Sequence, residues 1–243
     1  MKIALFSDIH ANLPALEATL KSIESQKPDA IYCLGDLVGY NVWPNEVIHE
    51  ITKRGIATLA GNHDVKAKKV WRDGSDSSYY YAIIGTDEMG YLSTLPAHIR
   101  LEFRYNDIPL NILMVHGSPY CNKEYLLEDK DEAEFLSIFS ATDIHILLFG
   151  HSHKPYHRIL QSGDDANPKY VHAINVGSVG KPKDGDPRAC YVMLTLGQDS
   201  NPFEKESVGV EFIRVAYDIE KAAAAIENSK LQDTLADMLR KAY

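Results

Sequence analysis

Short apolar runs, each followed at once by polar residues, recur along the chain and predict its architecture. The runs with this form are Ile3–Phe6, Ile31–Leu34, Ala57–Ala60, Ile112–Val115 and Ile144–Phe149. Apolar runs of this length, bounded by turn residues, are typical of buried strands. Between the first three runs, apolar residues recur with helical spacing, as in Leu16, Leu20 and Ile23 and again in Val47, Ile48 and Ile51. Strands that alternate with helices indicate an α/β fold.

The second half of the chain is richer in predicted strands. Arg100–Tyr105 and Ile108–Val115 are expected to form a hairpin, and Glu132–Phe139 a short helix. The further predicted strands are Tyr156–Leu160, Tyr170–Val176, Ala189–Leu196 and Val208–Val215. An amphipathic helical stretch then ends the chain, with an apolar stripe formed by Ile226, Leu231, Leu235 and Leu239.

The polar residues that follow the five apolar runs are rich in carboxylate, imidazole and amide groups. They are Asp8-Ile9-His10, Gly35-Asp36, Gly61-Asn62-His63-Asp64, His116-Gly117 and Gly150-His151-Ser152-His153. Strand ends are where a sheet presents functional groups, because the strand fixes the residue and the loop leaves it accessible. The five clusters therefore predict one metal site with nitrogen and oxygen ligands. Both halves of the chain contribute to it, which favours a single domain over residues 1–243.

The spacing of these residues suits two metal ions better than one. Asp8 and His10 are two residues apart, as are His151 and His153, and such pairs point to the same side of an extended segment. The candidate ligands are Asp8, His10, Asp36, Asn62, His116, His151 and His153. They are too many for one ion and fit two ions that share Asp36, since a carboxylate has two oxygens. Imidazole and carboxylate without thiolate suit Mn, Fe, Co, Ni or Zn, of which we expect Mn²⁺.

A pair of divalent ions about 3.5–4 Å apart is a known arrangement for the hydrolysis of phosphate esters. Such ions bind the phosphoryl oxygens and acidify a bridging water, so that the resulting hydroxide attacks phosphorus. No Gly-x-Ser-x-Gly elbow or phosphate-binding P-loop occurs in the sequence. His63 is the expected donor of a proton or hydrogen bond to the leaving oxygen, with Asp64 holding its imidazole in the right tautomer.

Charge and cysteine content narrow the classes of partner and compartment. The 243 residues carry a formal net charge of -9, which gives no general attraction to nucleic acid or anionic membranes. No run approaches the ~20 apolar residues of a membrane span, and the apolar start is too short for a signal peptide. Isolated Cys33, Cys121 and Cys190 suggest a reducing compartment. We therefore expect a cytoplasmic protein that takes small phosphate esters, without stable nucleic-acid or membrane binding; the oligomeric state stays open.

The ordered set of motifs between residues 8 and 153 resembles the calcineurin-like metallophosphoesterases. The resemblance implies a four-layer αββα sandwich with two packed mixed β-sheets, an α/β (α+β) fold with a dinuclear centre at one edge. It implies one ion held by Asp8, His10, Asp36 and His153, and a second held by Asp36, Asn62, His116 and His151. It also implies His63 as the proton donor and Asp64 as its partner.

A narrower resemblance concerns the segments Asp8–Leu16 and Gly35–Tyr40 and the motif that begins at Asn175. These resemble the small prokaryotic phosphodiesterase branch, which is similar to the diadenosine tetraphosphatases. Val176 stands where proline is usual in that branch, and Asn41 where glycine is frequent. Neither position is a candidate ligand, but both are expected near the rim of the site, so they bear on the substrate.

Residues outside the motifs must set specificity. Lys66–Tyr81, polar and rich in Lys and Tyr, is expected to be a long loop or a helix–loop segment that either stacks a base and steers phosphate or is an ordinary solvated loop. Lys181, Lys183, Arg188, Tyr40 and Asn41 are further candidates for substrate contact. The remaining histidines have no expected ligand role; they are His49, His98, His145, His157 and His172.

The function expected from these features is a metal-dependent phosphodiesterase or phosphatase that acts on small substrates, nucleotides among them. The alternative is a catalytically silent scaffold of the same fold that acts through protein partners, although every ligand position and His63 are filled. A nuclease is disfavoured by the acidic charge and by the lack of an appended DNA-binding or capping domain. A dedicated protein phosphatase is disfavoured by the short chain.

Overall fold

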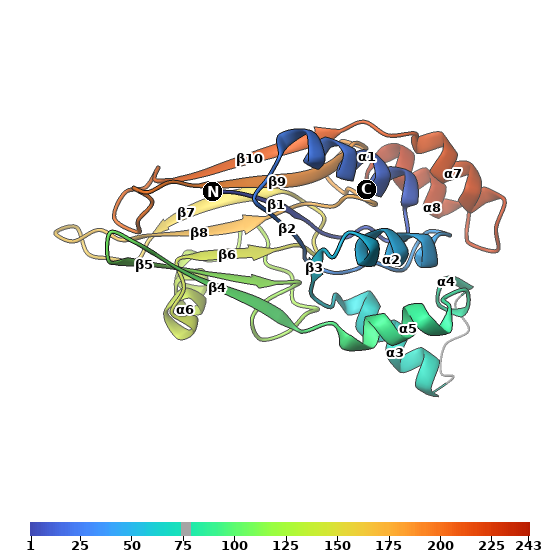
Figure 1. Ribbon diagram of the computed structural model, residues 1–243, viewed down its shortest axis with the longest axis horizontal. Helices are drawn as coiled ribbons and strands as arrows, with labels where there is room; N and C mark the ends of the chain where they lie inside the picture. The colour runs from blue at the N-terminus through green and yellow to red at the C-terminus, as the bar shows by residue number, and fades with distance from the viewer. Residues whose placement is uncertain (74–78) are drawn as a thin grey trace.

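Two five-stranded sheets form the centre of the molecule (Figure 1). The computed structural model describes residues 1–73 and 79–243. For residues 71–73 it describes the main chain but not the side chains. The first sheet has the order β10-β9-β1-β2-β3. β1, β2 and β3 are parallel, whereas β9 runs antiparallel to both β1 and β10. The bounds are β1 Lys2–Phe6, β2 Ala30–Cys33, β3 Ala57–Thr58, β9 Ala189–Leu196 and β10 Val208–Val215.

The second sheet has the order β4-β5-β6-β8-β7. β5, β6 and β8 are parallel, and the edge strands β4 and β7 run antiparallel to their neighbours, so this sheet is also mixed. The bounds are β4 His98–Tyr105, β5 Ile108–Val115, β6 Ile146–Phe149, β7 Tyr156–Gln161 and β8 Tyr170–Asn175. The predicted hairpin is therefore the β4–β5 pair.

Alternation along the buried strands builds the layers, because successive side chains of a strand point to opposite faces. Ile3 and Leu5 of β1 pack between the two sheets with Ile112 of β5. Ala4 and Phe6 face the other way and pack in the core that contains apolar residues of α1 (Leu13–Gln26) and α2 (Pro44–Lys53). On the far face of the second sheet, apolar residues of β5 and β6 pack against α6 (Glu132–Thr142). The predicted four-layer αββα sandwich is confirmed.

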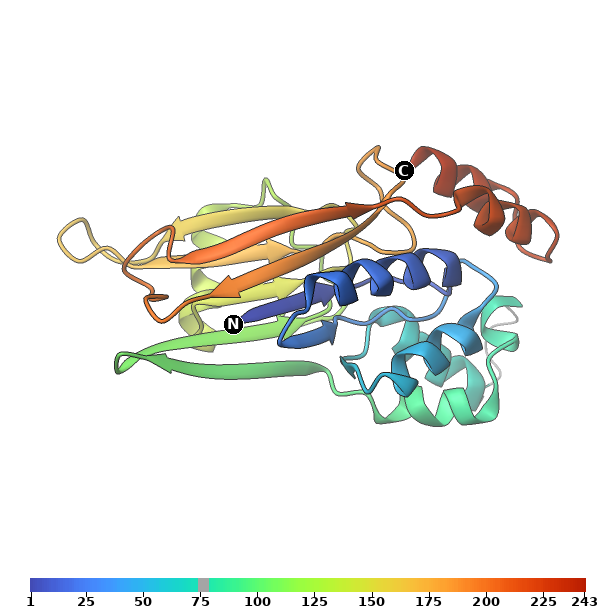
Figure 2. The same cartoon turned by 45° about the horizontal axis from the view of Figure 1, so that its top comes forward.

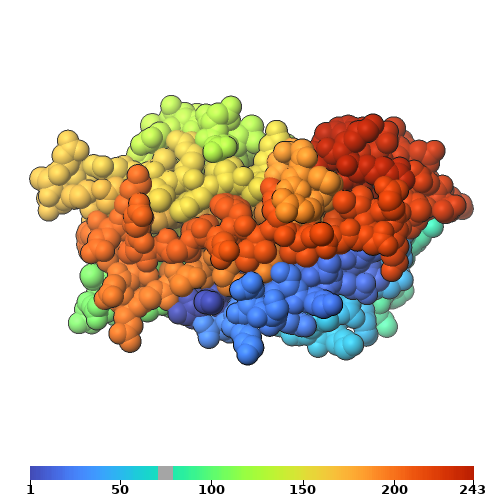
Figure 3. Space-filling model, turned by 90° about the horizontal axis from the view of Figure 1, so that it is seen from above, coloured from blue at the N-terminus to red at the C-terminus, as the bar shows by residue number. Residues whose placement is uncertain are grey.

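The other helices gather at one end of the molecule (Figure 2). They are α3 Asn62–Asp73, α4 Tyr79–Ala82, α5 Thr86–Thr94, α7 Ile219–Glu227 and α8 Thr234–Lys241. Much of the segment expected as a loop or helix–loop is thus helical, and its residues 74–78 lie outside the described residues. The space-filling view shows α7 and α8 in red at that end, with the blue N-terminal segment alongside β10 (Figure 3). None of the described helices combines the length and apolar character that a membrane crossing needs.

The carboxyl ends of the parallel strands point toward this helical end in both ribbon views (Figures 1 and 2). β1 and β2 of one sheet and β5, β6 and β8 of the other each lead directly into one of the motifs singled out above. The facing sheets therefore bring polar segments that are far apart in sequence to the same end of the molecule.

Candidate metal centre

The loops that follow β1 and β2 are joined by main-chain hydrogen bonds. The amide of Asp8 donates to the carbonyl of Gly35 at 3.0 Å, and the amide of His10 donates to the carbonyl of Asp36 at 2.9 Å. Gly61 allows the third loop to approach, since a Cβ on it would lie 2.1 Å from Oδ1 of Asp36. These contacts fix the candidate ligands of three strand ends relative to one another.

Five of the candidate ligands adopt a left-handed backbone conformation, with positive φ angles at Asp8, His10, Asp36, His151 and His153. This conformation is uncommon for residues other than glycine and is strained. The surrounding hydrogen bonds hold it in place. Asp8 Oδ2, for example, accepts from the amide of His151 at 3.0 Å, which ties the first motif to the last.

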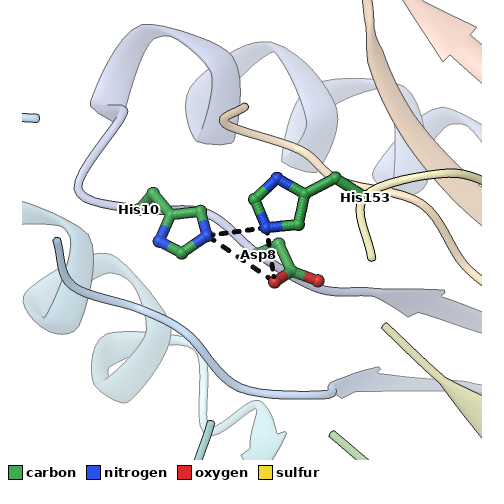
Figure 4. Close-up of side chains that lie close together, drawn as sticks. All are labelled: Asp8, His10 and His153. Carbon is green, nitrogen blue, oxygen red and sulfur yellow. Dashed lines mark hydrogen bonds and ion pairs between the residues drawn. The ribbon is translucent and has the colours of Figure 1, made fainter. Parts of the chain in front are cut away.

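Asp8, His10 and His153 converge at one point (Figure 4). The Nε2 atoms of His10 and His153 lie 3.1 Å apart. Oδ1 of Asp8 is 3.1 Å from Nε2 of His153 and 3.6 Å from Nε2 of His10. All three side chains are buried.

The protons of these imidazoles are held on the outer side of the cluster. Nδ1 of His10 lies 3.1 Å from the carbonyl oxygen of Val38, and Nδ1 of His153 lies 2.5 Å from that of Lys181. A carbonyl oxygen only accepts, so each Nδ1 carries the proton and each neutral ring turns the Nε2 lone pair inward. Two nitrogen lone pairs and a carboxylate oxygen therefore face one another, and Asp8 Oδ1 has no hydrogen-bond partner among the described residues.

A second group consists of Asp36, His116 and His151, whose ligand atoms lie within 4.8 Å of one another. His116 has the same orientation as the first two histidines, with Nδ1 2.8 Å from the carbonyl oxygen of Leu34. Its Nε2 lies 3.0 Å from Oδ1 of Asn62, an oxygen that can only accept. Nε2 of His151 is buried and has no hydrogen-bond partner in the described part of the chain.

Asp36 lies between the two groups. Its Oδ2 is 3.7 Å from Nε2 of His10 and 3.3 Å from Nε2 of His116, whereas Oδ1 accepts from the amide of His63 at 2.7 Å. One carboxylate oxygen thus faces a histidine of each group. A single Asp in this position would be able to hold ions on both sides.

Burial and charge set the protonation of the cluster. Burial lowers the pKa of His10, His151 and His153, so these rings are neutral at neutral pH. Burial alone would raise the pKa of Asp8, but the positive charge that the nearby histidines, His153 foremost, carry at low pH holds the pKa of Asp8 well below its usual range. Asp36 is likewise lowered against its burial, chiefly by His116. Asp8 and Asp36 are therefore ionised and these three imidazoles neutral, which are the forms that bind metal.

His116 differs from the other histidines. Burial opposes its charged form, but Asp36 and Asp8 outweigh that effect and raise its pKa to about 10. A protonated Nε2 of His116 therefore lies next to oxygens of both Asp36 and Asn62, which can accept its hydrogen bond. The donor set as a whole, with inward lone pairs and unpartnered buried atoms, suits divalent cations.

His63 lies beside this cluster, and the structure corrects its expected partnership with Asp64. Among the described residues, the hydrogen bonds of the Asp64 carboxylate go to main-chain amides. Oδ2 accepts from Asp36 and Gly61 at 2.8 and 2.9 Å, and Oδ1 accepts from Leu37 at 3.0 Å. Asp64 thus holds the metal loops, and the ring of His63 is bonded through Nδ1 to the hydroxyl of Tyr81 at 3.1 Å.

Two residues outside the expected ligand set support the site. Nδ2 of Asn175 donates to the carbonyl of Gly150 at 2.8 Å, which fixes the loop that bears His151 and His153. The ring of Tyr125 stacks on His151 with centroids 4.2 Å apart. Asn175 is the last residue of the buried strand β8 and begins a motif noted in the sequence, whereas nothing in the sequence indicates Tyr125.

The residues expected at the rim have different environments. Lys181 is buried, with Nζ 5.2 Å from the ring centroid of Tyr40 and 3.4 Å from the carbonyl oxygen of Tyr243. Tyr40 itself packs on both His10 and His63, with centroids 4.7 Å apart in each case. Arg188 instead pairs with Asp186 on the surface.

The histidines without an expected ligand role stay outside the metal-capable groups found among the described residues. His157 and His172 stack on each other on β7 and β8, with Nε2 of His157 2.9 Å from Nδ1 of His172.

Comparison with known proteins shows which family and which structures this chain is similar to. Residues 1–155 match the calcineurin-like phosphoesterase family. An uncharacterized protein of Methanocaldococcus jannaschii is 30% identical to this chain, in an alignment that covers 98% of this chain and 96% of that protein. The crystal structure of a metallophosphoesterase from Sphaerobacter thermophilus is 27% identical, with full coverage of both chains (100% each) and a TM-score of 0.74.

A putative diadenosine tetraphosphatase of known structure also shares the fold, with 18% identity, 88% and 93% coverage of the two chains and a TM-score of 0.53. The family match confirms the broader resemblance drawn from the motifs, and the diadenosine tetraphosphatase structure shows a shared fold. The matched segment, residues 1–155, extends past His153 and so includes all the candidate ligands.

Proposed function

This chain belongs to the calcineurin-like phosphoesterase family, and we propose that it is a phosphoesterase that uses two divalent metal ions to hydrolyse small phosphate esters. The observation that carries the proposal is the convergence of the Nε2 lone pairs of His10 and His153 on the ionised carboxylate of Asp8, with the carboxylate of Asp36 close to His10. Such a buried arrangement is unfavourable on its own and becomes favourable when cations lie between the donors.

The proposed ligands fall into two sets that share Asp36. Asp8, His10, Asp36 and His153 would hold one ion, and Asp36, Asn62, His116 and His151 the other. Two of the three groups whose ligand atoms lie within 4.8 Å of one another support this division, and the third group joins His63 to His10 and Asp36. We propose Mn²⁺ as the metal, with Fe, Zn, Ni and Co as alternatives, because the donors are imidazole, amide and carboxylate without thiolate.

The chemistry that such ions supply is neutralisation of phosphoryl charge and a lower pKa for water. Other residues of the chain hold the proposed ligands in position. Asp64 and the main chain hold the metal loops together, while Asn175 fixes the loop of the last two histidines. His63 is the proposed donor to the leaving oxygen, since its ring lies 5.0 Å from that of His10 at the edge of the site.

We propose phosphodiesters or phosphomonoesters of nucleotide size as substrates. Tyr40 provides an aromatic ring beside His10 and His63. Lys183 is half-buried and interacts electrostatically with Asp8 and Asp36. An aromatic ring and a cation next to a metal site suit a small ester with a flat group and an anionic phosphate.

The proposal is tested by hydrolysis of bis(p-nitrophenyl) phosphate and p-nitrophenyl phosphate by protein supplied with Mn²⁺. We expect turnover of at least one of the esters, loss of turnover with a chelator, and a loss of at least about a hundredfold in Asp36→Asn, the size of effect that accompanies lost transition-state stabilisation. Asp129→Asn, a change at an exposed carboxylate, is the matched control and should retain activity.

A folded protein that binds the ions yet hydrolyses neither ester with Mn, Fe, Co, Ni or Zn would contradict the proposal. That result would favour the scaffold alternative, in which the same fold serves protein partners.

A further inference from the structure

The role proposed for His63 requires its proton to be on a defined ring nitrogen. A neutral imidazole donates from one nitrogen only, and the partner of the other nitrogen decides which one. A hydrogen-bond donor at Nδ1 would leave the ring proton on Nε2, and an acceptor at Nδ1 would do the opposite.

Two residues close to His63, Asp64 and Gly39, do not supply a hydrogen-bond partner for its Nδ1. Asp64 follows His63 in sequence, but its carboxylate accepts from the amides of Asp36, Leu37 and Gly61. Gly39 lies against the ring and has no side chain; a Cβ there would be 2.6 Å from Nδ1 of His63. The close approach leaves no room on that side for a larger residue.

Tyr81 supplies the contact. It belongs to α4, is 3% exposed, and its hydroxyl lies 3.1 Å from Nδ1 of His63. Its ring is fixed by the edge of Tyr80, with centroids 4.6 Å apart. Burial raises the pKa of Tyr81, so its hydroxyl keeps the proton that it can donate.

We propose that Tyr81 is a positioning residue for the reaction: its hydroxyl donates to Nδ1 of His63, which keeps the ring proton on Nε2 and available to the leaving oxygen of the ester. This inference rests on the proposed function and deepens it. The hydrolysis itself is unchanged: the oxygen of water bonds to phosphorus and loses a proton to solvent, while the bond from phosphorus to the leaving oxygen breaks and the phenolate departs to take up a proton from solvent. His63 stabilises the charge that develops on that oxygen.

The test uses Mn²⁺-loaded protein and aryl phosphate diesters whose leaving phenols range from p-nitrophenol to unsubstituted phenol. A poor leaving group depends on hydrogen bonding to its oxygen more than a good one does. We expect Tyr81→Phe to lower kcat about 3- to 10-fold for the phenol ester, the effect of one hydrogen bond, and to change it less than about twofold for the nitrophenol ester. KM should stay the same, and His63→Gln should show the same trend more strongly.

Tyr80→Phe is the matched control, because it removes a hydroxyl from the neighbouring position of α4 and leaves the Tyr81 bond in place. It should not alter the dependence on leaving group. A Tyr81→Phe variant that is slower by one factor for every ester would overturn the proposal, because a structural defect lowers all rates alike. Wild-type protein without turnover would instead contradict the proposed function, so the two failures are distinguishable.

Imidazole ¹⁵N NMR of the protein loaded with diamagnetic Zn²⁺ gives a second readout that does not depend on activity. We expect an unprotonated Nδ1 and a protonated Nε2 for His63 in the wild-type protein, with a mixture of tautomers in Tyr81→Phe. A proton on Nδ1 in the wild-type protein would mean that Tyr81 accepts from the ring, which would overturn the inference.

Discussion

The Nε2 atoms of His10 and His153 lie 3.1 Å apart, although Nδ1 of each ring donates its hydrogen bond to a main-chain carbonyl oxygen. Two lone pairs therefore face each other at hydrogen-bond distance, with Oδ1 of Asp8 beside them. The fold holds this arrangement through positive φ angles at all three residues. A protein that keeps acceptors facing one another is organised for an occupant with positive charge.

A first prediction concerns Asp8→Asn. Since Oδ2 of Asp8 accepts from the amide of His151, the new amide group would take the place of Oδ1 and donate to Nε2 of His153. We expect the metal-free variant to be more stable to urea than metal-free wild-type protein by about 1 kcal/mol, the worth of one hydrogen bond. The same variant should lose affinity for Mn²⁺ in calorimetric titration. A less stable metal-free variant would contradict the orientation of the lone pairs.

A second prediction concerns Asp64→Asn. The carboxylate accepts three main-chain hydrogen bonds, and an amide group in its place would turn a donor toward at least one main-chain donor. We expect a loss of about 1–3 kcal/mol in the free energy of unfolding, because a buried donor loses its acceptor. Asp129→Asn, at an exposed position, is the control. Unchanged stability with altered leaving-group dependence would instead restore Asp64 as the partner of His63.

A third prediction concerns pH and His172. Burial, followed by the neighbouring His157, lowers the pKa of His172 to about 4 from its ordinary 6.5. His172 therefore binds a proton more readily in the unfolded chain than in the folded protein. Its contribution to stability is fully present above pH 6.5 and is lost as the pH falls toward 4.

In the wild-type protein, the shifted pKa of His172 should lower the free energy of unfolding by up to about 3 kcal/mol between pH 7 and pH 4. His172→Gln should lack this contribution, and His49→Gln, an exposed control on α2, should retain it. Identical pH dependence in the His172 variant and the wild-type protein would show that His172 titrates normally.

The hydrophobic pattern predicted both the buried strands, such as β6 and β9, and the strands with an exposed side, such as β4 and β10. β9 and β10 were predicted with their observed bounds, and the β4–β5 hairpin at its observed turn. β3 is shorter than the run Ala57–Ala60, because it pairs with β2 at two residues only. Apolar runs show that a segment is buried, but pairing with a neighbouring strand decides its length.

The proposed ligands could be predicted from the sequence because each follows a strand end, and parallel strands bring their ends together. The partner of His63 could not be predicted in this way. Asp64 is its neighbour in sequence, but α3 begins at Asn62 and the Asp64 carboxylate bonds to the amides of Gly61, Asp36 and Leu37 instead. Tyr81 reaches the ring from another helix, and only the packing of α4 against α3 makes that contact.

The central claim, that Asp36 holds two ions between opposing histidines, is tested most directly by anomalous X-ray scattering from crystals grown with Mn²⁺. The account predicts two anomalous peaks about 3.5–4 Å apart, both in contact with Asp36, one beside His10 and His153 and the other beside His116 and His151. A single peak, or peaks away from these residues, would contradict it.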